Sequence, residues 1–288
     1  MKFITFSRGG VEAPGAWLGD GKVVDLTPVA PTLLALIEGG AAALAKAADV
    51  AGSAPAIAAG EVELLAPIPR TRKNVFCVGR NYVDHVAEGA RAMGLQQKLP
   101  EVPQFFTKAP TAINAPGAPV RLDSRLTKLL DYEVELAVVI GTTGRDIPAE
   151  RAYDHVFGYT IANDVTARDL QRRHDQWFKG KSLDTTLPLG PWIIDKAEIG
   201  DPTTLELSLT VNGQERQRSK ASMMIFDIPA IIASLSAGMT LEAGDIIATG
   251  TPSGVGFAMD PPQGLKDGDV VIARIDRIGE LMSPIREV

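Results

Sequence analysis

Short runs of β-branched and aromatic residues, bounded by glycine, proline or aspartate, make up most of the chain after residue 70. Such runs are typical of strands, because branched and aromatic side chains pack well on a pleated surface. They predict strands at 74–78, 104–106, 131–140, 156–163, 192–195, 205–211, 245–249 and 270–275. Asn212-Gly213 predicts a hairpin, since both central positions of a type I′ turn need positive φ.

Helices are few in this part of the chain. The pattern predicts one at 165–175 and one at 228–236, the second with Asp227 as its N-cap and Gly238 after its end. This is not the strand-helix alternation of a Rossmann fold or a TIM barrel. The sequence therefore predicts a mainly β fold with α+β elements.

The first 65 residues have a different pattern. Three short strands and one alanine-rich helical stretch are predicted there, at 3–6, 17–18, 22–26 and 31–60. Pro67 and Pro69 then interrupt both helix and strand pairing, which is typical of a linker. We predict a small N-terminal α+β domain over residues 1–69 and a catalytic domain over 70–288.

Cysteine and histidine are scarce. The chain has one cysteine, Cys77, which lies in an apolar run typical of a core strand, and three histidines among 288 residues. An intrachain disulfide, a zinc finger and an iron-sulfur cluster are therefore excluded. Any bound metal must be held mostly by carboxylates.

Charge and hydropathy narrow the class of partner. The formal net charge of −6 argues against a nucleic-acid partner, because binding phosphates needs concentrated lysine and arginine. No apolar run approaches the roughly 20 residues of a membrane span, and the N-terminus lacks the apolar stretch of a signal peptide. We expect a cytoplasmic protein that does not bind membranes.

Three carboxylates are candidate metal ligands. Glu133 and Glu135 share one face of the predicted strand 131–140, because side chains alternate along a strand. A solvated strand edge is the alternative interpretation. Asp164 follows strand 156–163, where it could instead cap a helix. If the three meet, they supply the oxygen ligands that Mg²⁺ or Mn²⁺ prefers, with positions left for water and substrate.

His85 and Glu88 are a candidate catalytic pair. Residues three apart share a face of a helix, so the carboxylate can hold the imidazole in one orientation. A histidine held in this way could take a proton from water as a general base. An ordinary surface pair on a helix is the alternative.

A group of donors follows Asp164. Arg168 and Gln171 are three apart, and together with Lys181 they could stabilise an oxyanion or a carboxylate. Arg172 and Arg173 indicate only a solvated basic face.

The glycine-rich turn at 248–256 is a further candidate site. It lacks the lysine of a P-loop and the glycine spacing of a dinucleotide site, which disfavours nucleotide binding. The backbone amides and the Thr251 hydroxyl could hold a small carboxylate. The chain has no Gly-x-Ser-x-Gly elbow, so serine-hydrolase chemistry is not expected.

Five segments, taken in order over residues 70–288, resemble the fumarylacetoacetate hydrolase (FAH) superfamily. They are Gly79-Arg-Asn-Tyr with His85 and Glu88, Asp131-Tyr-Glu-Val-Glu-Leu, Asn163-Asp-Val-Thr-Ala-Arg-Asp-Leu-Gln, Gly180-Lys-Ser, and Thr249-Gly-Thr-Pro-Ser-Gly-Val-Gly. The resemblance implies a mixed β-sandwich roll after a small N-terminal domain, a homodimer, and a Mg²⁺ or Mn²⁺ cofactor.

The resemblance also implies roles for individual residues. It makes Glu133, Glu135 and Asp164 the metal ligands, His85, Glu88 and Lys181 the catalytic residues, and Arg80, Tyr82, Arg168, Gln171 and Thr251 the substrate contacts. The chain departs from the fumarylacetoacetate hydrolases proper at Val78, where they have a further metal-binding aspartate. It is more similar to the shorter bacterial acylpyruvate hydrolases and hydroxyhepta-dienedioate isomerase-like members.

The expected function is hydrolysis of a carbon-carbon bond in a small 2,4-dioxo acid of the acylpyruvate or fumarylpyruvate type, through a metal-bound enolate, as in aromatic catabolism. The same site could serve an oxaloacetate decarboxylase or a 5-carboxymethyl-2-hydroxymuconate-type isomerase. A non-catalytic metabolite-binding protein is the alternative from another class. Residues 89–104 are expected to form part of a lid.

Overall fold

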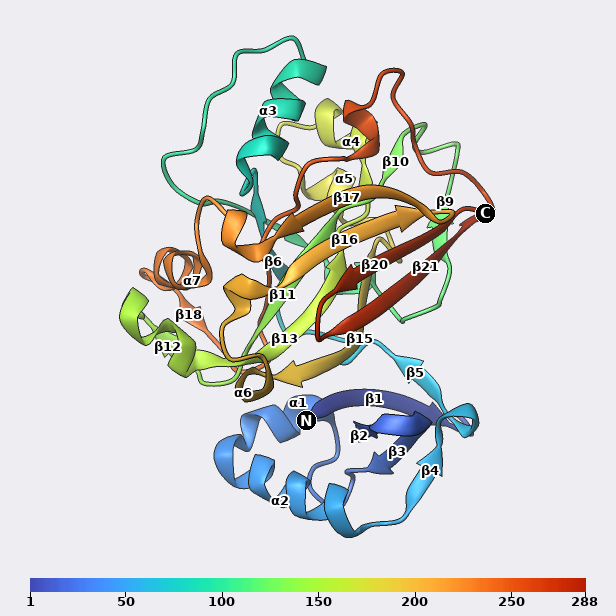
Figure 1. The fold of residues 1–288 in the computed structure, drawn as a ribbon, viewed down its shortest axis with the longest axis vertical. Coiled ribbons are helices and arrows are strands. Elements are labelled where there is room, and N and C mark those ends of the chain that lie inside the picture. Colours follow the sequence, from blue (N-terminus) through green and yellow to red (C-terminus); the bar gives the residue numbers. More distant parts are fainter.

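The structure is a computed structural model that describes the backbone of residues 1–288 and every side chain except that of residue 20. Figure 1 shows the N-terminal elements as a small group at one end of the molecule, with the remaining strands and helices above them. No helix among the described residues is both long and apolar enough to cross a membrane.

The N-terminal group is a small sheet with two helices. Its elements are β1 (Lys2–Arg8), β2 (Val11–Leu18), β3 (Lys22–Asp25), α1 (Leu33–Glu38), α2 (Gly40–Ser53), β4 (Ala56–Ala58) and β5 (Glu63–Leu65). The three predicted strands are confirmed. The helical prediction for 31–60 is confirmed within 33–53 but wrong at Ala56–Ala58, which forms β4. Strand β1 also pairs with a strand of the later chain, with Lys2 opposite Ile194, so the small sheet continues into the main one. The domain boundary near residue 70 stays a prediction.

The main sheet forms the centre of the molecule. Beyond β1 it continues through β15 (Leu187–Asp195), β13 (Val156–Asn163), β11 (Val134–Ile140), β19 (Ile246–Ala248), β6 (Val75–Gly79) and β7 (Gln104–Lys108), with β8 (Ile113–Asn114) beside β15. Every residue of β11 and β13 is buried. A strand buried on both faces is a nearly continuous apolar run, which explains the composition of these two segments.

A second sheet packs against this one and closes the core. It consists of β17 (Gln214–Lys220), β16 (Glu206–Val211), β20 (Val270–Ile275), β21 (Gly279–Glu287) and β9 (Val120–Leu122). Apolar side chains of both sheets, such as Leu136, Ile161 and Leu209, belong to one buried cluster. Two sheets that bury their facing apolar side chains are a sandwich. This confirms the mainly β fold.

The remaining elements are short. Two small ribbons pair β10 (Leu130–Asp131) with β14 (Thr166–Ala167) and β12 (Gly144–Arg145) with β18 (Thr240–Leu241), and the helices are α3 (Val83–Ala92), α4 (Arg168–Arg173), α5 (Phe178–Lys181), α6 (Lys196–Ile199) and α7 (Ile228–Ser236). The longest 3₁₀ segment is Ala149–His155. Helices α3, α4 and α5 gather at one end of the main sheet (Figure 1).

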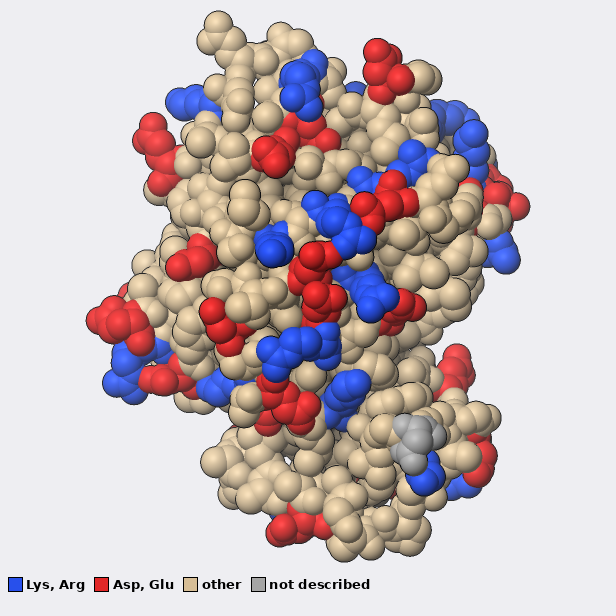
Figure 2. Space-filling model, viewed as in Figure 1, with Lys and Arg blue, Asp and Glu red and all other residues tan. Residues whose placement is uncertain are grey.

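The outer face of the second sheet is charged but mixed in sign. Figure 2 shows acidic and basic side chains interspersed over it, with no continuous basic patch on the face drawn. Arg218, for example, contacts both Glu206 and Glu215. Exposed ion pairs of this kind contribute little to stability, so the fold depends on the buried cluster instead.

Several predicted elements lie at their predicted bounds. Strands 156–163 and 270–275 and helix 228–236 are confirmed, with Asp227 capping the helix. The Asn212-Gly213 hairpin joins β16 to β17, with φ of +51° and +78°.

The prediction of a helix over 165–175 was partly wrong. Thr166–Ala167 forms a strand, and α4 covers only Arg168–Arg173. Ala167 occupies the N-cap position and makes no side-chain cap bond. Asp164 is therefore not a helix cap, because tertiary pairing with β10 holds the chain extended after it.

Gly158 provides a test of the packing between β13 and β15. A Cβ at this position would collide with the backbone carbonyl of Ile194 on the paired strand. We expect Gly158→Ala to lower the free energy of unfolding by about 1–3 kcal/mol or more, as overpacking in a rigid core does. The measurement is the midpoint and slope of denaturant unfolding.

Gly52→Ala is the matched control. Gly52 lies in α2 with open space where its Cβ would be. Alanine there should leave the protein unchanged or stabilise it by up to about 1 kcal/mol, because alanine loses less backbone freedom than glycine. Equal stability of the two variants would contradict the close approach of β13 and β15.

Candidate active site

Three carboxylates meet at one end of the main sheet. Glu133 immediately precedes β11, Glu135 lies within it, and Asp164 follows β13. The two strands are antiparallel with Val134 opposite Asn163, so the start of one lies beside the end of the other. Ligand atoms of all three carboxylates lie within 4.8 Å of one another. Their residues are 4%, 1% and 0% exposed, so the solvated-edge interpretation was wrong.

Two buried lysines contact this cluster. Lys181 Nζ donates to Glu133 Oε2 and to Asp164 Oδ2, both at 2.7 Å. Lys108 Nζ donates to Asp164 Oδ1 at 2.7 Å and to the Val165 carbonyl at 2.9 Å. Gly180 permits the contacts of Lys181, because any side chain at residue 180 would collide with the backbone of Gln171 where α5 packs against α4.

Glu135 differs from the other two carboxylates. Within the described residues it forms no salt bridge, and it accepts a hydrogen bond from the Gly250 N–H at 2.8 Å. Burial raises the pKa of Glu135 well above its usual value, and the adjacent Asp164 and Glu133 carboxylates raise it further. Burial also acts on Glu133, but Lys181 and Arg168 outweigh it and lower the pKa of that carboxyl.

The donor set fits a hard divalent cation. Three carboxylate oxygens from different positions converge, and one carboxylate has no cationic partner among the described residues. Mg²⁺ and Mn²⁺ prefer oxygen ligands of this kind. We therefore identify Glu133, Glu135 and Asp164 as the residues that could hold the metal.

Arg168 links the cluster to a second buried carboxylate. Its Nε donates to Asp131 Oδ2 at 2.9 Å, and its Nη2 lies 2.6 Å from Glu133 Oε1. Asp131 also accepts hydrogen bonds from the N–H groups of Gly256 and Phe257, at 2.8 and 3.1 Å. Asp131 therefore fixes α4 and the segment at 256–257 in the same place.

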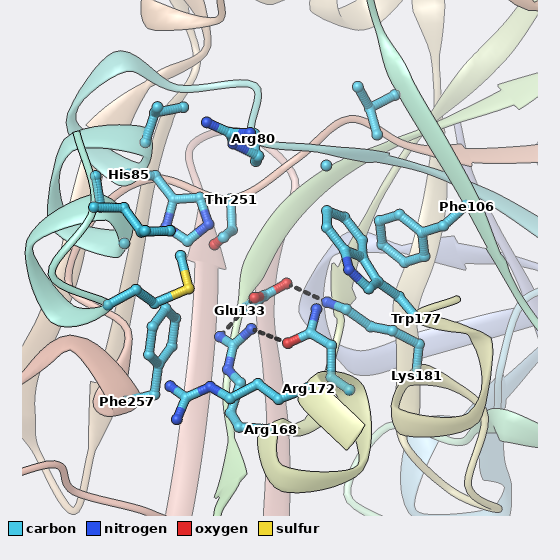
Figure 3. A pocket seen from close by; sticks show the side chains of 18 of the residues that line it. Arg80, His85, Phe106, Glu133, Arg168, Arg172, Trp177, Lys181, Thr251 and Phe257 are labelled. Carbon is cyan, nitrogen blue, oxygen red and sulfur yellow. Dashed lines mark hydrogen bonds and ion pairs between the residues drawn. The ribbon is translucent and has the colours of Figure 1, made fainter. Parts of the chain in front are cut away.

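A cavity of about 420 Å³ opens above the carboxylates. In Figure 3, His85 and Thr251 lie on one side of Glu133, Phe106, Trp177 and Lys181 on another, and Arg168, Arg172 and Phe257 below. Both polar and aromatic side chains therefore face the space over the carboxylate cluster.

The histidine pair lies in α3 and faces this cavity. His85 Nδ1 is 2.9 Å from Glu88 Oε1, and the side chains are 12% and 10% exposed, so this is not a surface pair. The other Glu88 oxygen accepts the Gly254 N–H at 2.8 Å. A fixed carboxylate acceptor places the proton on Nδ1, which leaves Nε2 with a lone pair. The geometry suits a general base.

Of the other predicted substrate contacts, three line the cavity and one does not. Gln171 lines the cavity and accepts a bond from Arg168 Nη1 at 3.3 Å. Thr251 also lines the cavity, while its hydroxyl donates to the Val134 carbonyl at 3.0 Å.

Arg80 lines the cavity with a left-handed φ of +57°, and its Nη2 donates to the Lys98 carbonyl at 2.6 Å. Tyr82 is not a lining residue: it is 2% exposed and packs into the core.

Sequence patterns missed several residues of the site. Lys108 gave no signal and Asp131, although part of a matching segment, was given no role, because a single charged residue at a strand end is usually solvated. Arg172 is exposed, as the interpretation of a solvated face expected, but it also lines the cavity, 5.2 Å over the Phe257 ring. Arg173 does not line the cavity. The expected lid segment contributes Met93, Leu95 and Gln96 to the cavity wall.

Comparison with known proteins agrees with the family resemblance of the sequence. The family model for the fumarylacetoacetate (FAA) hydrolase C-terminal region matches residues 74–286. The oxaloacetate tautomerase YisK of Bacillus subtilis is 55% identical over 225 residues, which cover 78% of this chain and 73% of that protein.

Two solved structures share the fold over the whole chain. Fumarylacetoacetate hydrolase from Exiguobacterium antarcticum is 43% identical with a TM-score of 0.87, and 100% of each chain is covered. Maleylpyruvate hydrolase from Sphingobium sp. SYK-6, in complex with manganese(II) and pyruvate, is 30% identical with a TM-score of 0.82, and 100% and 99% are covered. The fold that the sequence resemblance implied is confirmed.

Metal titration tests the carboxylate cluster. We expect calorimetric titration with MnCl₂ to show one site per chain, and Glu135→Gln to weaken binding by about 10- to 100-fold or more, since even residues that only orient ligands have effects of that size. Glu280→Gln, at an exposed ion pair with Arg274, is the control and should bind as the wild type does. Unchanged affinity in Glu135→Gln would remove this residue from the metal site.

Proposed function

The chain belongs to the fumarylacetoacetate hydrolase family, and we propose that it is a divalent-metal-dependent enzyme that interconverts the keto and enol forms of a short 2-oxo dicarboxylic acid such as oxaloacetate. The observation that carries this proposal is the buried carboxylate cluster at the floor of a cavity that also presents Lys181 and Arg168. The 55% identity to a named oxaloacetate tautomerase favours this reaction over others that the same site could support.

The cluster and its neighbours suit the stabilisation of an enolate. Held by Glu133, Glu135 and Asp164, Mg²⁺ or Mn²⁺ would supply a Lewis acid for the keto oxygen and carboxylate of a 2-oxo acid. The Lys181 ammonium is fixed by two carboxylates at 2.7 Å, so its position costs no reorganisation when negative charge develops nearby. Arg168 is held in the same way by Asp131 and Glu133.

His85 is the group that moves the proton in this proposal. Conversion of keto to enol removes a proton from the carbon beside the keto group and places one on the oxygen. His85 Nε2 takes the carbon-bound proton, and Glu88 stabilises the imidazolium that results. The imidazolium then gives this proton to the enolate oxygen, so that His85 returns to its neutral form and the enol is complete. In the reverse direction the same nitrogen returns the proton to carbon.

Hydrolysis of a 2,4-dioxo acid, the function that the sequence favoured, is the second candidate. One observation supports it: a chain of the same fold is a maleylpyruvate hydrolase. His85 would then take its proton from water instead of from carbon. Decarboxylation and isomerisation would pass through the same kind of enolate as tautomerisation and differ from it in the bond that breaks. A non-catalytic binding protein would need no oriented base.

We also propose, from the resemblance alone, that the enzyme is a homodimer whose partner molecules are small 2-oxo acids and neither nucleic acid nor membrane. Sedimentation of the purified protein tests this part. A monomer at micromolar concentration would contradict it.

An ultraviolet assay tests the reaction. Loss of the absorbance of enol-oxaloacetate should be faster with enzyme and Mg²⁺ or Mn²⁺ than with either alone, should stop with EDTA, and should return when metal is restored. Metal-independent turnover would refute the proposal. Faster cleavage of acetylpyruvate or fumarylpyruvate than tautomerisation of oxaloacetate would establish the hydrolase instead.

His85→Asn tests the proton transfer. Removal of a general base typically lowers the rate by about 10²- to 10⁴-fold, and we expect a fall in kcat within this range, with metal affinity unchanged. Glu88→Gln should cause a smaller loss, because it leaves the imidazole in place. His155→Asn, at a histidine outside the cavity lining, is the control. Wild-type kcat in His85→Asn would exclude the base.

A further inference from the structure

Arg172 is unlike the other cationic side chains of the cavity. Arg168 is paired with Asp131 and Glu133, Lys181 is paired with Glu133 and Asp164, and Arg80 donates to the Lys98 carbonyl. Within the described part of the chain, Arg172 forms no hydrogen bond or ion pair, and its contact is with the Phe257 ring. Its five N–H donors are therefore available to a ligand.

Phe257 holds the Arg172 guanidinium at the cavity wall. Arg168 lies 4.5 Å and Arg172 lies 5.2 Å from the centroid of this ring. The backbone of Phe257 is anchored, because its N–H donates to Asp131, and the residue is only 8% exposed. Stacking of a guanidinium on an aromatic face reduces the freedom that the side chain loses when it binds an anion.

The position of Arg172 is as informative as its lack of a partner. Figure 3 shows its guanidinium beside Phe257, on the far side of Arg168 from Glu133. A ligand with one end over the carboxylate cluster therefore meets Arg168 first and Arg172 further along. The cavity therefore has the carboxylate cluster at one end and, further along, a cation without a partner among the described residues.

We propose that Arg172 determines specificity by binding the distal carboxylate of a 2-oxo dicarboxylic acid. This inference rests on the proposed function and adds to it the residue that separates diacids from monoacids. A guanidinium matches a carboxylate through two parallel N–H···O bonds, which lysine cannot form. Asp175 also lines the cavity, so loss of the Arg172 charge would leave an acidic group that repels a diacid.

The test compares two acids of equal chain length. Oxaloacetate and 2-oxobutanoate both have four carbons and an enolisable carbon beside the keto group, but only oxaloacetate has the second carboxylate. Exchange of the hydrogens on that carbon with D₂O, followed by NMR with Mn²⁺-free, Mg²⁺-loaded enzyme, gives kcat/KM for each acid.

We expect Arg172→Gln to lower the ratio of kcat/KM for oxaloacetate to that for 2-oxobutanoate by about tenfold, the size of one partly exposed charge-assisted hydrogen bond. The change should lie in KM for oxaloacetate, while kcat/KM for 2-oxobutanoate stays within about twofold of the wild type. Arg172→Lys should fall between, because it keeps the charge but not the paired donors.

Arg173→Gln is the matched control, since Arg173 is the next residue of the same helix, is exposed, and does not line the cavity. It should leave the ratio unchanged. An equal fall for both acids in Arg172→Gln, or no fall for either, would overturn the assignment.

Binding separates failure of this inference from failure of the proposed function. If the wild type exchanges neither acid, the proposed function is wrong, and calorimetric titration of both acids in the presence of Mg²⁺ then decides the role of Arg172. A loss of affinity in Arg172→Gln confined to the diacid would support the inference. Equal affinity of the wild type for the two acids would overturn it.

Discussion

The rest of the site depends on the burial of three carboxylates at adjacent strand ends. Like charges that are this close and shielded from water repel strongly, and an unpaired buried charge is far more costly than a paired one. Lys108, Lys181 and the Arg168 guanidinium offset the cost for Glu133 and Asp164, but no ion pair within the described residues reaches Glu135. The cluster is therefore electrostatically incomplete in a way that a divalent cation would complete.

The same charges also join parts of the fold. Strands β11 and β13 bring the carboxylates together by their register, while Asp131 binds both Arg168 of α4 and the backbone at 256–257. The residues that orient the site and those that hold its walls are thus one network. Hydrogen-bonded networks in a low dielectric are stronger than their separate members. A change at Asp131 would therefore affect both the carboxylate cluster at the floor of the cavity and the walls formed by α4 and residues 256–257.

Sequence alone predicted the parts of the site that follow from local periodicity. Alternation along a strand placed Glu133 and Glu135 on one face, and the three-residue spacing of a helix placed His85 beside Glu88. It could not predict the role of Lys108, whose partner Asp164 lies 56 residues away. It also gave no sign that the exposed Arg172 lines the cavity, because a basic pair on a helix has the same pattern whether or not an aromatic ring from a distant loop lies beside one member.

The division between floor and walls explains how one site can serve several reactions. The carboxylate cluster and its cations come from strand ends, α5 and the first residue of α4, all packed into the core, so their geometry is fixed by the buried sheet. The walls come from α3, the segment that follows it, α4 and the 256–257 segment. Met93 and Leu95, in the segment after α3, are more than half exposed. Enolisation needs only the floor and a base. The bond that then forms or breaks is decided by what the walls hold beyond the enolate, so substitutions there can change the net reaction without disturbing the charge balance beneath.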